Sequence, residues 1–228
     1  MSDRWATFDC YGTLIDWMSG IHATLSRLFP DAYAPALVAR YHQIEPKVQA
    51  GVGTPYRKVM AQVLAELASS EELELPAGES DALGESLPSW PVFPEVPAAL
   101  EALRSSGWKL AILSNTDPDL LDASLQAIGV PVDVRIVASE VGSYKPVFGH
   151  WEEFFRITSA DRTRHVHVAA SLFHDVEPCA TLGLPCVWIN RMSETSPLPR
   201  AATLTDLTEL PETLETLVPG ARSTPGSI

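Results

Sequence analysis

WATFDCYGTL (residues 5–14) is the stretch that decides the fold. An apolar run ends in Asp9, and a Gly-Thr turn follows at residues 12–13. An aspartate in this place lies at the C-terminal edge of a buried strand, and the loop after it can offer backbone N–H groups to an anion. We therefore interpret Asp9 as a candidate nucleophile. Taken alone, an aspartate at a strand end can equally be the cap of a helix.

The chain has 228 residues, which is enough for one large domain with an insertion or for two smaller domains. Its net charge of −13 argues against nucleic acid or an anionic membrane surface as a partner. The sequence has no run of about 18 apolar residues, so we expect no transmembrane helix. The N-terminus is expected to enter the first strand directly, without room for a signal peptide. The cysteines Cys10, Cys179 and Cys186 have no metal-ligand spacing and cannot all pair, which favours a reducing, cytoplasmic setting.

Short apolar runs alternate with helical patterns in the second half of the chain. Runs at residues 108–113, 134–137, 165–170 and 186–189 predict four more strands, with helices between them. This succession predicts an α/β fold, a doubly wound parallel sheet with a Rossmann-like core. Ligands of such sheets bind at the carboxyl ends of the strands.

Residues 17–91 follow a different pattern. Apolar residues recur there at helical spacing, without a convincing strand. Three prolines within residues 91–97 predict the point where the chain returns to the sheet. We expect a core domain of residues 1–16 and 92–228, with an inserted helical cap domain at residues 17–91.

Four short polar motifs come at or just after the ends of predicted strands. They are Asp9 to Thr13, Ser114-Asn115, Tyr144-Lys145-Pro146 and Ser171 to Asp175. A nucleophile, a hydroxyl–amide pair, a lysine and a distal acid in this order are hard to explain as unrelated loop residues.

These motifs and the helical insertion resemble the haloacid dehalogenase superfamily, and the resemblance covers nearly the whole chain. Most members of that superfamily are magnesium-dependent phosphatases, and a minority are haloacid dehalogenases that need no metal. The motifs are most similar to those of the type II, or L-2-, haloacid dehalogenases.

Two departures from the superfamily pattern speak against the phosphatase branch. The pattern supplies a general acid two residues after the nucleophile, where this chain has Tyr11. It also supplies a metal-binding carboxylate in the fourth motif, and the matching residue here is Ala170. Because magnesium sheds water reluctantly, one remaining carboxylate, Asp175, is a poor site for it. We therefore expect neither a metal nor another cofactor.

The dehalogenase branch of the resemblance assigns a role to most of the polar residues. It implies that Asp9 attacks the α-carbon, that Thr13 orients Asp9, and that Lys145 stands beside it. It further implies that Arg40 and Asn115 cradle the departing halide.

The same resemblance accounts for substrate binding and for the hydrolytic step. Ser114, with the backbone N–H groups of Cys10 and Tyr11, would hold the substrate carboxylate. Asp175, helped by Ser171, would prepare the water that hydrolyses the ester.

The fourth motif departs from the dehalogenase pattern at two places. Where the family commonly has Ser-Ser-Asn, this chain has Ala170, Ser171 and Leu172, so water activation is left to Asp175 and Ser171. Where dehalogenases often place a bulky aromatic residue, this chain has His174. Because a histidine can donate a hydrogen bond to a small, hard halide, we hypothesise that fluoroacetate is a substrate. His174 could equally cap the following helix or satisfy a buried carbonyl.

We therefore expect hydrolytic dehalogenation of short 2-haloalkanoic acids through an aspartyl ester, giving 2-hydroxy acids. Two alternatives stay open: a magnesium-dependent phosphatase of the same superfamily, and a non-catalytic member that binds an anion. Arg40 could be an ordinary salt-bridged helix residue and Lys145 an ordinary loop lysine, while His165 and His167 are expected to be structural. A homodimer would be compatible with the resemblance.

Overall fold

A computed structural model describes residues 2–49 and 54–220, and within them six strands form one parallel sheet. The strands are β1 (Arg4–Phe8), β2 (Trp108–Ser114), β3 (Val134–Val137), β4 (His165–Ala169), β5 (Cys186–Ile189) and β6 (Ala202–Leu204). Their order in the sheet is β3-β2-β1-β4-β5-β6. The prediction of a doubly wound parallel α/β sheet is confirmed. The sequence did not indicate β6, because this edge strand is short and only partly buried.

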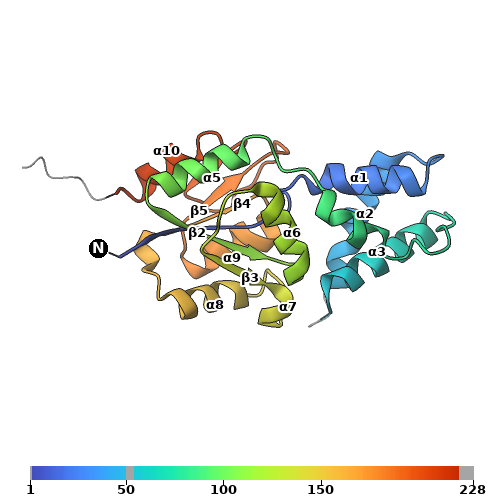
Figure 1. Cartoon of the computed structure of the whole chain (residues 1–228), viewed down its shortest axis with the longest axis horizontal. Helices are drawn as coiled ribbons and strands as arrows, with labels where there is room; N and C mark the ends of the chain where they lie inside the picture. The colour runs from blue at the N-terminus through green and yellow to red at the C-terminus, as the bar shows by residue number, and fades with distance from the viewer. Residues whose placement is uncertain (1, 50–53, 221–228) are drawn as a thin grey trace, which may run out of the picture.

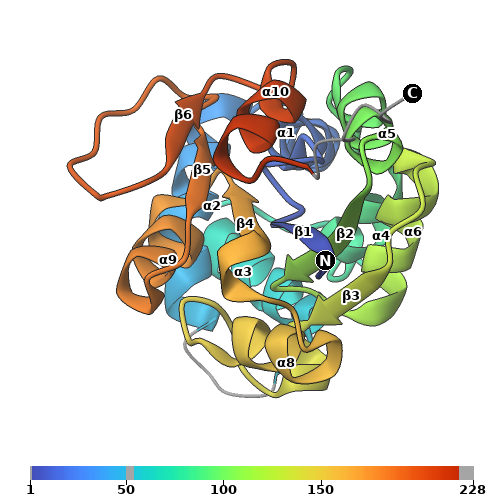
Figure 2. The same cartoon turned by 90° about the vertical axis from the view of Figure 1, so that its left-hand side faces the viewer.

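Side chains of the central strands alternate between two cores, as the two-residue period of a strand requires. Ala6 and Phe8 belong to one core and Trp5 to the other. Figure 2 shows α5 and α10 on one side of the sheet and α8 and α9 on the other. From residue 96 onward, helices and a helical turn accompany the sheet. They are α5 (Val96–Ser105), α6 (Pro118–Ile128), α7 (Ala138–Val141), α8 (Gly149–Thr158), the turn Leu172–Val176, α9 (Glu177–Leu182) and α10 (Leu210–Leu217).

The strand order changes direction at β1. The chain passes from β1 to β2 and β3 on one side, and then crosses to β4, β5 and β6 on the other. In open parallel sheets, such a reversal leaves a crevice at the carboxyl ends of the central strands. The loops that follow β1, β2 and β4 therefore meet at one place.

A helical segment separates β1 from α5 and lies to one side of the sheet core (Figure 1). It comprises α1 (Trp17–Leu28), α2 (Ala34–Gln49), α3 (Tyr56–Ser70), α4 (Ala82–Ser86) and the 3-10 turn Leu87–Ser89. No helix among the described residues is both long and apolar enough to span a membrane.

The chain enters and leaves this segment side by side. The Asp16 N–H donates to the Pro91 carbonyl at 2.8 Å, and the Phe93 N–H donates to the Leu14 carbonyl at 3.0 Å. These paired crossings are consistent with an insertion. We propose that residues 17–91 act as a cap over a core of residues 1–16 and 92–228.

The indole of Trp90 links the helical segment to the loop after β1. It is buried against Gly20 of α1, where an added Cβ would lie 2.3 Å from the indole Cγ. Its Nε1–H donates to Ser86 Oγ at 3.1 Å, and its ring packs edge-on against Tyr11 with centroids 5.9 Å apart. The missing side chain at position 20 is therefore what allows the indole to lie there.

We expect Gly20→Ala to lower the free energy of unfolding by about 1–3 kcal/mol, because the new methyl overpacks the Trp90 contact. This loss outweighs the roughly 1 kcal/mol that alanine gains in a helix. Urea denaturation measures it. Gly84→Ala in α4 is the matched control, since its Cβ would meet only flexible Arg57 and Met60 atoms at 3.6 Å. A Gly20→Ala protein as stable as the parent would contradict this packing.

Candidate active site

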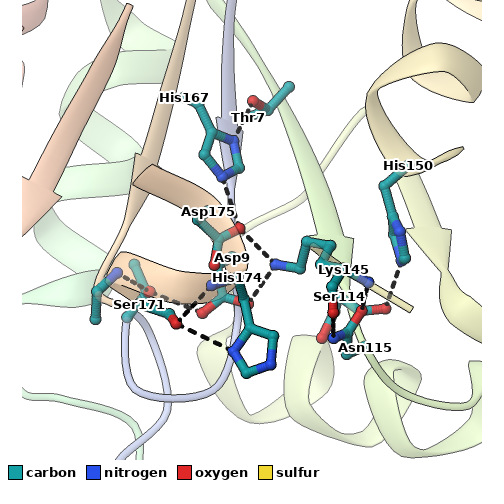
Figure 3. A network of polar contacts seen from close by, with 12 residues as sticks. Thr7, Asp9, Ser114, Asn115, Lys145, His150, His167, Ser171, His174 and Asp175 are labelled. Atoms are coloured by element: carbon teal, nitrogen blue, oxygen red, sulfur yellow. Dashed lines mark hydrogen bonds and ion pairs between the residues drawn. The ribbon is translucent and has the colours of Figure 1, made fainter. Parts of the chain in front are cut away.

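Polar side chains from four loops meet at the carboxyl edge of the sheet (Figure 3). Asp9 follows β1, Ser114 ends β2, Lys145 lies between α7 and α8, and Asp175 lies in the helical turn after β4. The order of motifs in the sequence thus predicted which loops converge.

The ammonium of Lys145 lies between two carboxylates. Its Nζ is 2.9 Å from Asp9 Oδ1 and 2.7 Å from Asp175 Oδ1, and all three residues are buried. Burial alone would lower the pKa of Lys145, but the charges of Asp175 and Asp9 outweigh burial and raise it. Burial would raise the pKa of Asp175, but Lys145 and a hydrogen bond from His167 hold it well below its usual range. An ammonium ion and an ionised Asp175 therefore face each other at 2.7 Å.

Thr13 orients the other oxygen of Asp9. The Thr13 hydroxyl accepts a hydrogen bond from the Ala170 N–H at 2.9 Å. Its own hydrogen is therefore free to be donated to Asp9 Oδ2, at 3.0 Å. Lys145 and Thr13 together hold both oxygens of Asp9 in a fixed direction.

Neither residue after Asp9 provides an acid or a second nucleophile. The Tyr11 hydroxyl lies 3.1 Å from Ser124 Oγ, and burial raises the pKa of this phenol. The Cys10 side chain is buried in the core, and burial, reinforced by the charge of Asp9, raises the pKa of its thiol well above its usual value. A phenol and a thiol in these surroundings stay protonated at neutral pH.

Ser114 and Asn115 have different contacts. Asn115 Nδ2–H donates to the Lys145 carbonyl at 2.9 Å, and its Oδ1 accepts from the Lys145 N–H at 2.7 Å. Because both ends of the amide bind the peptide of Lys145, these contacts argue against the predicted halide cradle and indicate that Asn115 places the lysine. Ser114 Oγ is buried and, within the described residues, has no hydrogen-bond partner. This hydroxyl lines the cavity and remains available to a ligand.

His174 has one nitrogen fixed by Ser171. Ser171 Oγ accepts from the His174 N–H at 3.1 Å and lies 3.1 Å from His174 Nδ1. Burial lowers the pKa of the imidazole, which is therefore neutral at pH 7. In the tautomer whose Nδ1 accepts from this hydroxyl, the proton of the ring is on Nε2. His174 also lines the cavity, so the ring can present an N–H donor there.

The prediction that Arg40 lines the site is wrong. Its guanidinium binds Gln43 Oε1 at 3.1 Å and Ser70 Oγ at 3.4 Å, and pairs with Glu71 at 3.5 Å. It is absent from the cavity wall, to which its neighbour Tyr41 belongs. Adjacent residues of a helix point about 100° apart, so the phase of α2 turns Tyr41 inward and Arg40 outward.

A cavity of about 880 Å³ opens between Asp9 and the helical segment. Its wall toward the segment is aromatic and is formed by Trp17, Tyr41, Tyr56, Trp90 and Phe93. None of these residues was among the predicted site residues, because the sequence does not show which aromatic side chains a cap presents to a core. The cavity is large enough for a small organic molecule.

Glu45 of α2 is the acidic residue of this wall. Its Oε1 accepts a hydrogen bond from the Tyr56 hydroxyl at 3.4 Å and another from the Gln49 amide. Burial raises the pKa of Glu45 to about 7. Its charge therefore changes in the neutral range, next to a ligand in the cavity.

Arg191, after β5, is a second residue that the sequence analysis missed. Its guanidinium donates to the Thr13 carbonyl at 2.9 Å, pairs with Glu95 at 2.6 Å and stacks over Phe93 at 3.5 Å. Its place after a predicted strand at the carboxyl edge was a usable signal. Arg191 and Lys145 are the only lysine or arginine residues among the described residues that line the cavity, and both face carboxylates.

The residues at this edge do not suit a divalent metal ion. The Lys145 ammonium already occupies the position between the Asp9 and Asp175 carboxylates. A methyl group stands at Ala170 beside them, where the superfamily pattern places a carboxylate. Across residues 2–49 and 54–220, no cluster of three histidine, cysteine, aspartate or glutamate residues has the arrangement of a metal site.

Comparison with known protein families identifies the fold. The family described as haloacid dehalogenase-like hydrolase matches residues 4–161. The chain belongs to the haloacid dehalogenase-like hydrolases. This confirms the superfamily that the four motifs indicated.

Two curated relatives of this haloacid dehalogenase-like hydrolase have names that state an activity. An (S)-2-haloacid dehalogenase 4A from Burkholderia cepacia is 28% identical over 148 residues, which are 63% of this chain and 64% of that enzyme. The match thus covers just under two thirds of that enzyme's length. A haloacetate dehalogenase H-2 from Moraxella sp. is 28% identical over 192 residues, which are 81% of this chain and 84% of that enzyme.

Solved structures share the fold over almost the whole length. The L-2-haloacid dehalogenase from Xanthobacter autotrophicus, solved with chloropropionic acid covalently bound, aligns with a TM-score of 0.82 and 18% identity. The alignment covers 93% of this chain and 98% of that one. At this identity the likeness concerns the fold alone.

We expect the affinity for a small monocarboxylate to fall about 3- to 10-fold as the pH rises through 7, because Glu45 becomes charged and repels the anion. Burial lowers the pKa of His42 and of His174, which moves the charging of both rings toward lower pH. Calorimetric titration with 2-hydroxypropionate between pH 6 and pH 8 measures the effect.

Glu45→Gln should remove this pH dependence, because an amide stays neutral. Glu194→Gln is the control, since Glu194 is exposed and also lines the cavity. The same pH dependence in Glu45→Gln as in the parent would assign it to another group.

Proposed function

We propose that this hydrolase cleaves the carbon–halogen bond of 2-haloalkanoic acids through an aspartyl ester and releases 2-hydroxy acids. The surroundings of Asp9 carry the proposal: Lys145 and Thr13 bind its two oxygens, and the phenol of Tyr11 is turned toward Ser124. A carboxylate held this way suits displacement at carbon and lacks the neighbouring acid that phosphoryl transfer uses. The names of the Burkholderia and Moraxella relatives, a 2-haloacid dehalogenase and a haloacetate dehalogenase, support the same reaction.

In the first step, an oxygen of Asp9 forms an ester bond to the α-carbon while the carbon–halogen bond breaks. The halide leaves with the bonding electron pair. Ser114 Oγ and the backbone N–H groups of Cys10 and Tyr11 would bind the substrate carboxylate. Support for Ser114 comes from its buried, unpartnered hydroxyl beside the cavity.

The halide would leave toward His174. Arg40 faces away from the cavity, and the amide of Asn115 is bound to the peptide of Lys145. An Nε2–H of His174 would be a donor in the cavity that is suited to a small anion. This supports the hypothesis that fluoroacetate is accepted, because a hydrogen bond stabilises fluoride more than larger halides.

In the second step, water attacks the aspartyl carbonyl carbon and Asp175 accepts its proton. The acyl–oxygen bond of the ester then breaks, and the departing oxygen takes that proton to give the 2-hydroxy acid. Asp175 Oδ2 has no hydrogen-bond partner among the described residues, which leaves it available to a water molecule. Ser171 stands beside it and would help to bind the water.

We expect halide release from 2-chloropropionate in EDTA, and a loss of about 10³-fold or more in Asp9→Asn. One oxygen of Asp9 should come from labelled water after a single turnover, which mass spectrometry of the peptide detects. Asp161→Asn is the control, because Asp161 is the exposed N-terminal residue before the 3-10 turn Arg162–Arg164 and is not part of the cavity lining. If the protein released no halide but hydrolysed phosphate esters in the presence of magnesium, the alternative function of a magnesium-dependent phosphatase would replace this proposal. Absence of both halide release and phosphate-ester hydrolysis would favour a non-catalytic anion binder.

We expect His174→Phe to lower the ratio of fluoride to chloride release by about 10-fold, the value of one hydrogen bond to an anion. His174→Gln retains an N–H donor and should lose less. Ion-selective measurement of both halides from fluoroacetate and chloroacetate gives the ratio. An unchanged ratio in His174→Phe would remove fluoride recognition from the role of this residue.

A further inference from the structure

A chain of hydrogen bonds runs beneath the candidate active site, on the face of the sheet that α8 and α9 cover. Thr7 Oγ1 lies 2.8 Å from His165 Nε2 and 2.8 Å from His167 Nδ1. His167 Nε2 lies 3.0 Å from Asp175 Oδ1 (Figure 3). All four residues are fully buried. The proposed reaction assigns no role to Thr7, His165 or His167.

Strand register makes this chain of contacts. Thr7 of β1 pairs directly with His167 of β4, and His165 lies two residues earlier on the same face. Aromatic rings surround both imidazoles: Trp151 packs against His167 with centroids 5.4 Å apart, and Phe155 packs against His165 at 5.1 Å. These apolar surroundings leave the imidazoles few partners besides Thr7 and Asp175.

The order of donors follows from the two ends of the chain. Asp175 is ionised and can only accept, so His167 Nε2 carries a proton. Burial lowers the pKa of His165 to about 3, so this ring is neutral, and its Nδ1 has no partner among the described residues. In the part of the chain that the structure describes, its other nitrogen has the Thr7 hydroxyl as its hydrogen-bond partner.

The Thr7 hydroxyl contacts two imidazoles but has only one hydrogen, so it can donate to one of them and must accept from the other. If His165 donates from Nε2 to Thr7 Oγ1, the hydroxyl must donate to His167 Nδ1. His167 is then neutral, with its proton on Nε2. A charged His167 would place a second buried cation on Asp175, which already binds the Lys145 ammonium.

We propose that His167 is a positioning residue that holds Asp175 for ester hydrolysis, and that Thr7 anchors the ring of His167 through its Nδ1. The inference rests on the proposed dehalogenase function. Asp175 Oδ1 accepts from both Lys145 and His167, so the carboxylate is fixed and its Oδ2 is left for the hydrolytic water. This arrangement compensates for the asparagine that is missing from the fourth motif.

Loss of the Thr7 hydroxyl would affect the two chemical steps differently. His167 Nδ1 would then lose its contact with Thr7 Oγ1, so the ring would no longer be held from behind and could not hold Asp175 in place. Asp9 keeps its own contacts to Lys145 and Thr13, so attack on the α-carbon would continue. The ester would accumulate because the water is no longer well placed.

Thr7→Val tests this prediction, because valine has the shape of threonine without the hydroxyl, and Thr7→Ser is the matched control. We expect Thr7→Val to release the first equivalent of halide at close to the parental rate. Its steady-state rate should fall at least ~10-fold, as expected when the carboxylate that binds the hydrolytic water is no longer held in place. Intact-protein mass spectrometry should show the covalent ester, and Thr7→Ser should restore turnover.

Nitrogen NMR of the imidazole rings tests the donor order without any variant. In the parent protein, His165 and His167 should both carry their proton on Nε2 at pH 7. A doubly protonated His167, or a proton on its Nδ1, would overturn the proposal even if Thr7→Val fails to fold. An equal loss of the first halide equivalent and of the steady-state rate in Thr7→Val would also overturn it.

The two proposals can fail separately. If the parent protein releases no halide, the dehalogenase function is wrong, whatever the imidazole spectra show. If the parent releases halide but Thr7→Val turns over at the parental rate without trapped ester, the positioning role alone is wrong.

Discussion

The Lys145 ammonium between Asp9 and Asp175 is the interaction on which the rest of the site depends. Two carboxylates at the same buried edge would repel each other without it, and the ammonium could not be buried without them. Removing one member of such a group leaves an uncompensated buried charge, at a cost of about 3–5 kcal/mol. The three residues therefore stabilise one another in the buried site.

The neighbouring polar groups can be understood as supports for this ion cluster. Asn115 binds the peptide of Lys145, Thr13 binds Asp9, and His167 binds Asp175, so each charged residue has its own hydrogen-bonding partner. Satisfied buried networks of this kind are rigid, because every alternative arrangement leaves a polar atom unpaired. A rigid carboxylate is what an in-line displacement at carbon requires.

The helical segment contributes shape and charge. With Arg40 turned outward, its cavity wall includes several aromatic rings and Glu45, together with Met18, His42 and Gln49. Both basic side chains among the described cavity residues are paired with carboxylates, so the cavity offers an anion mainly N–H and O–H groups. The proposed recognition of a haloacid therefore depends on neutral donors, and the charge state of Glu45 influences it directly.

The sequence by itself determined the sheet and the loops that meet at its edge. Alternating strand and helix patterns fix a parallel sheet, and strand ends in such a sheet share one edge, so Asp9, Ser114, Lys145 and Asp175 could be placed together from their order alone. Only the tertiary structure decided the parts that depend on packing. The phase of α2 decided which of its side chains face the cavity, and the register of β1 against β4 joined Thr7 to a histidine 160 residues away. Local patterns carry no information on either, because helix phase and strand register are set by contacts between residues that are distant along the chain.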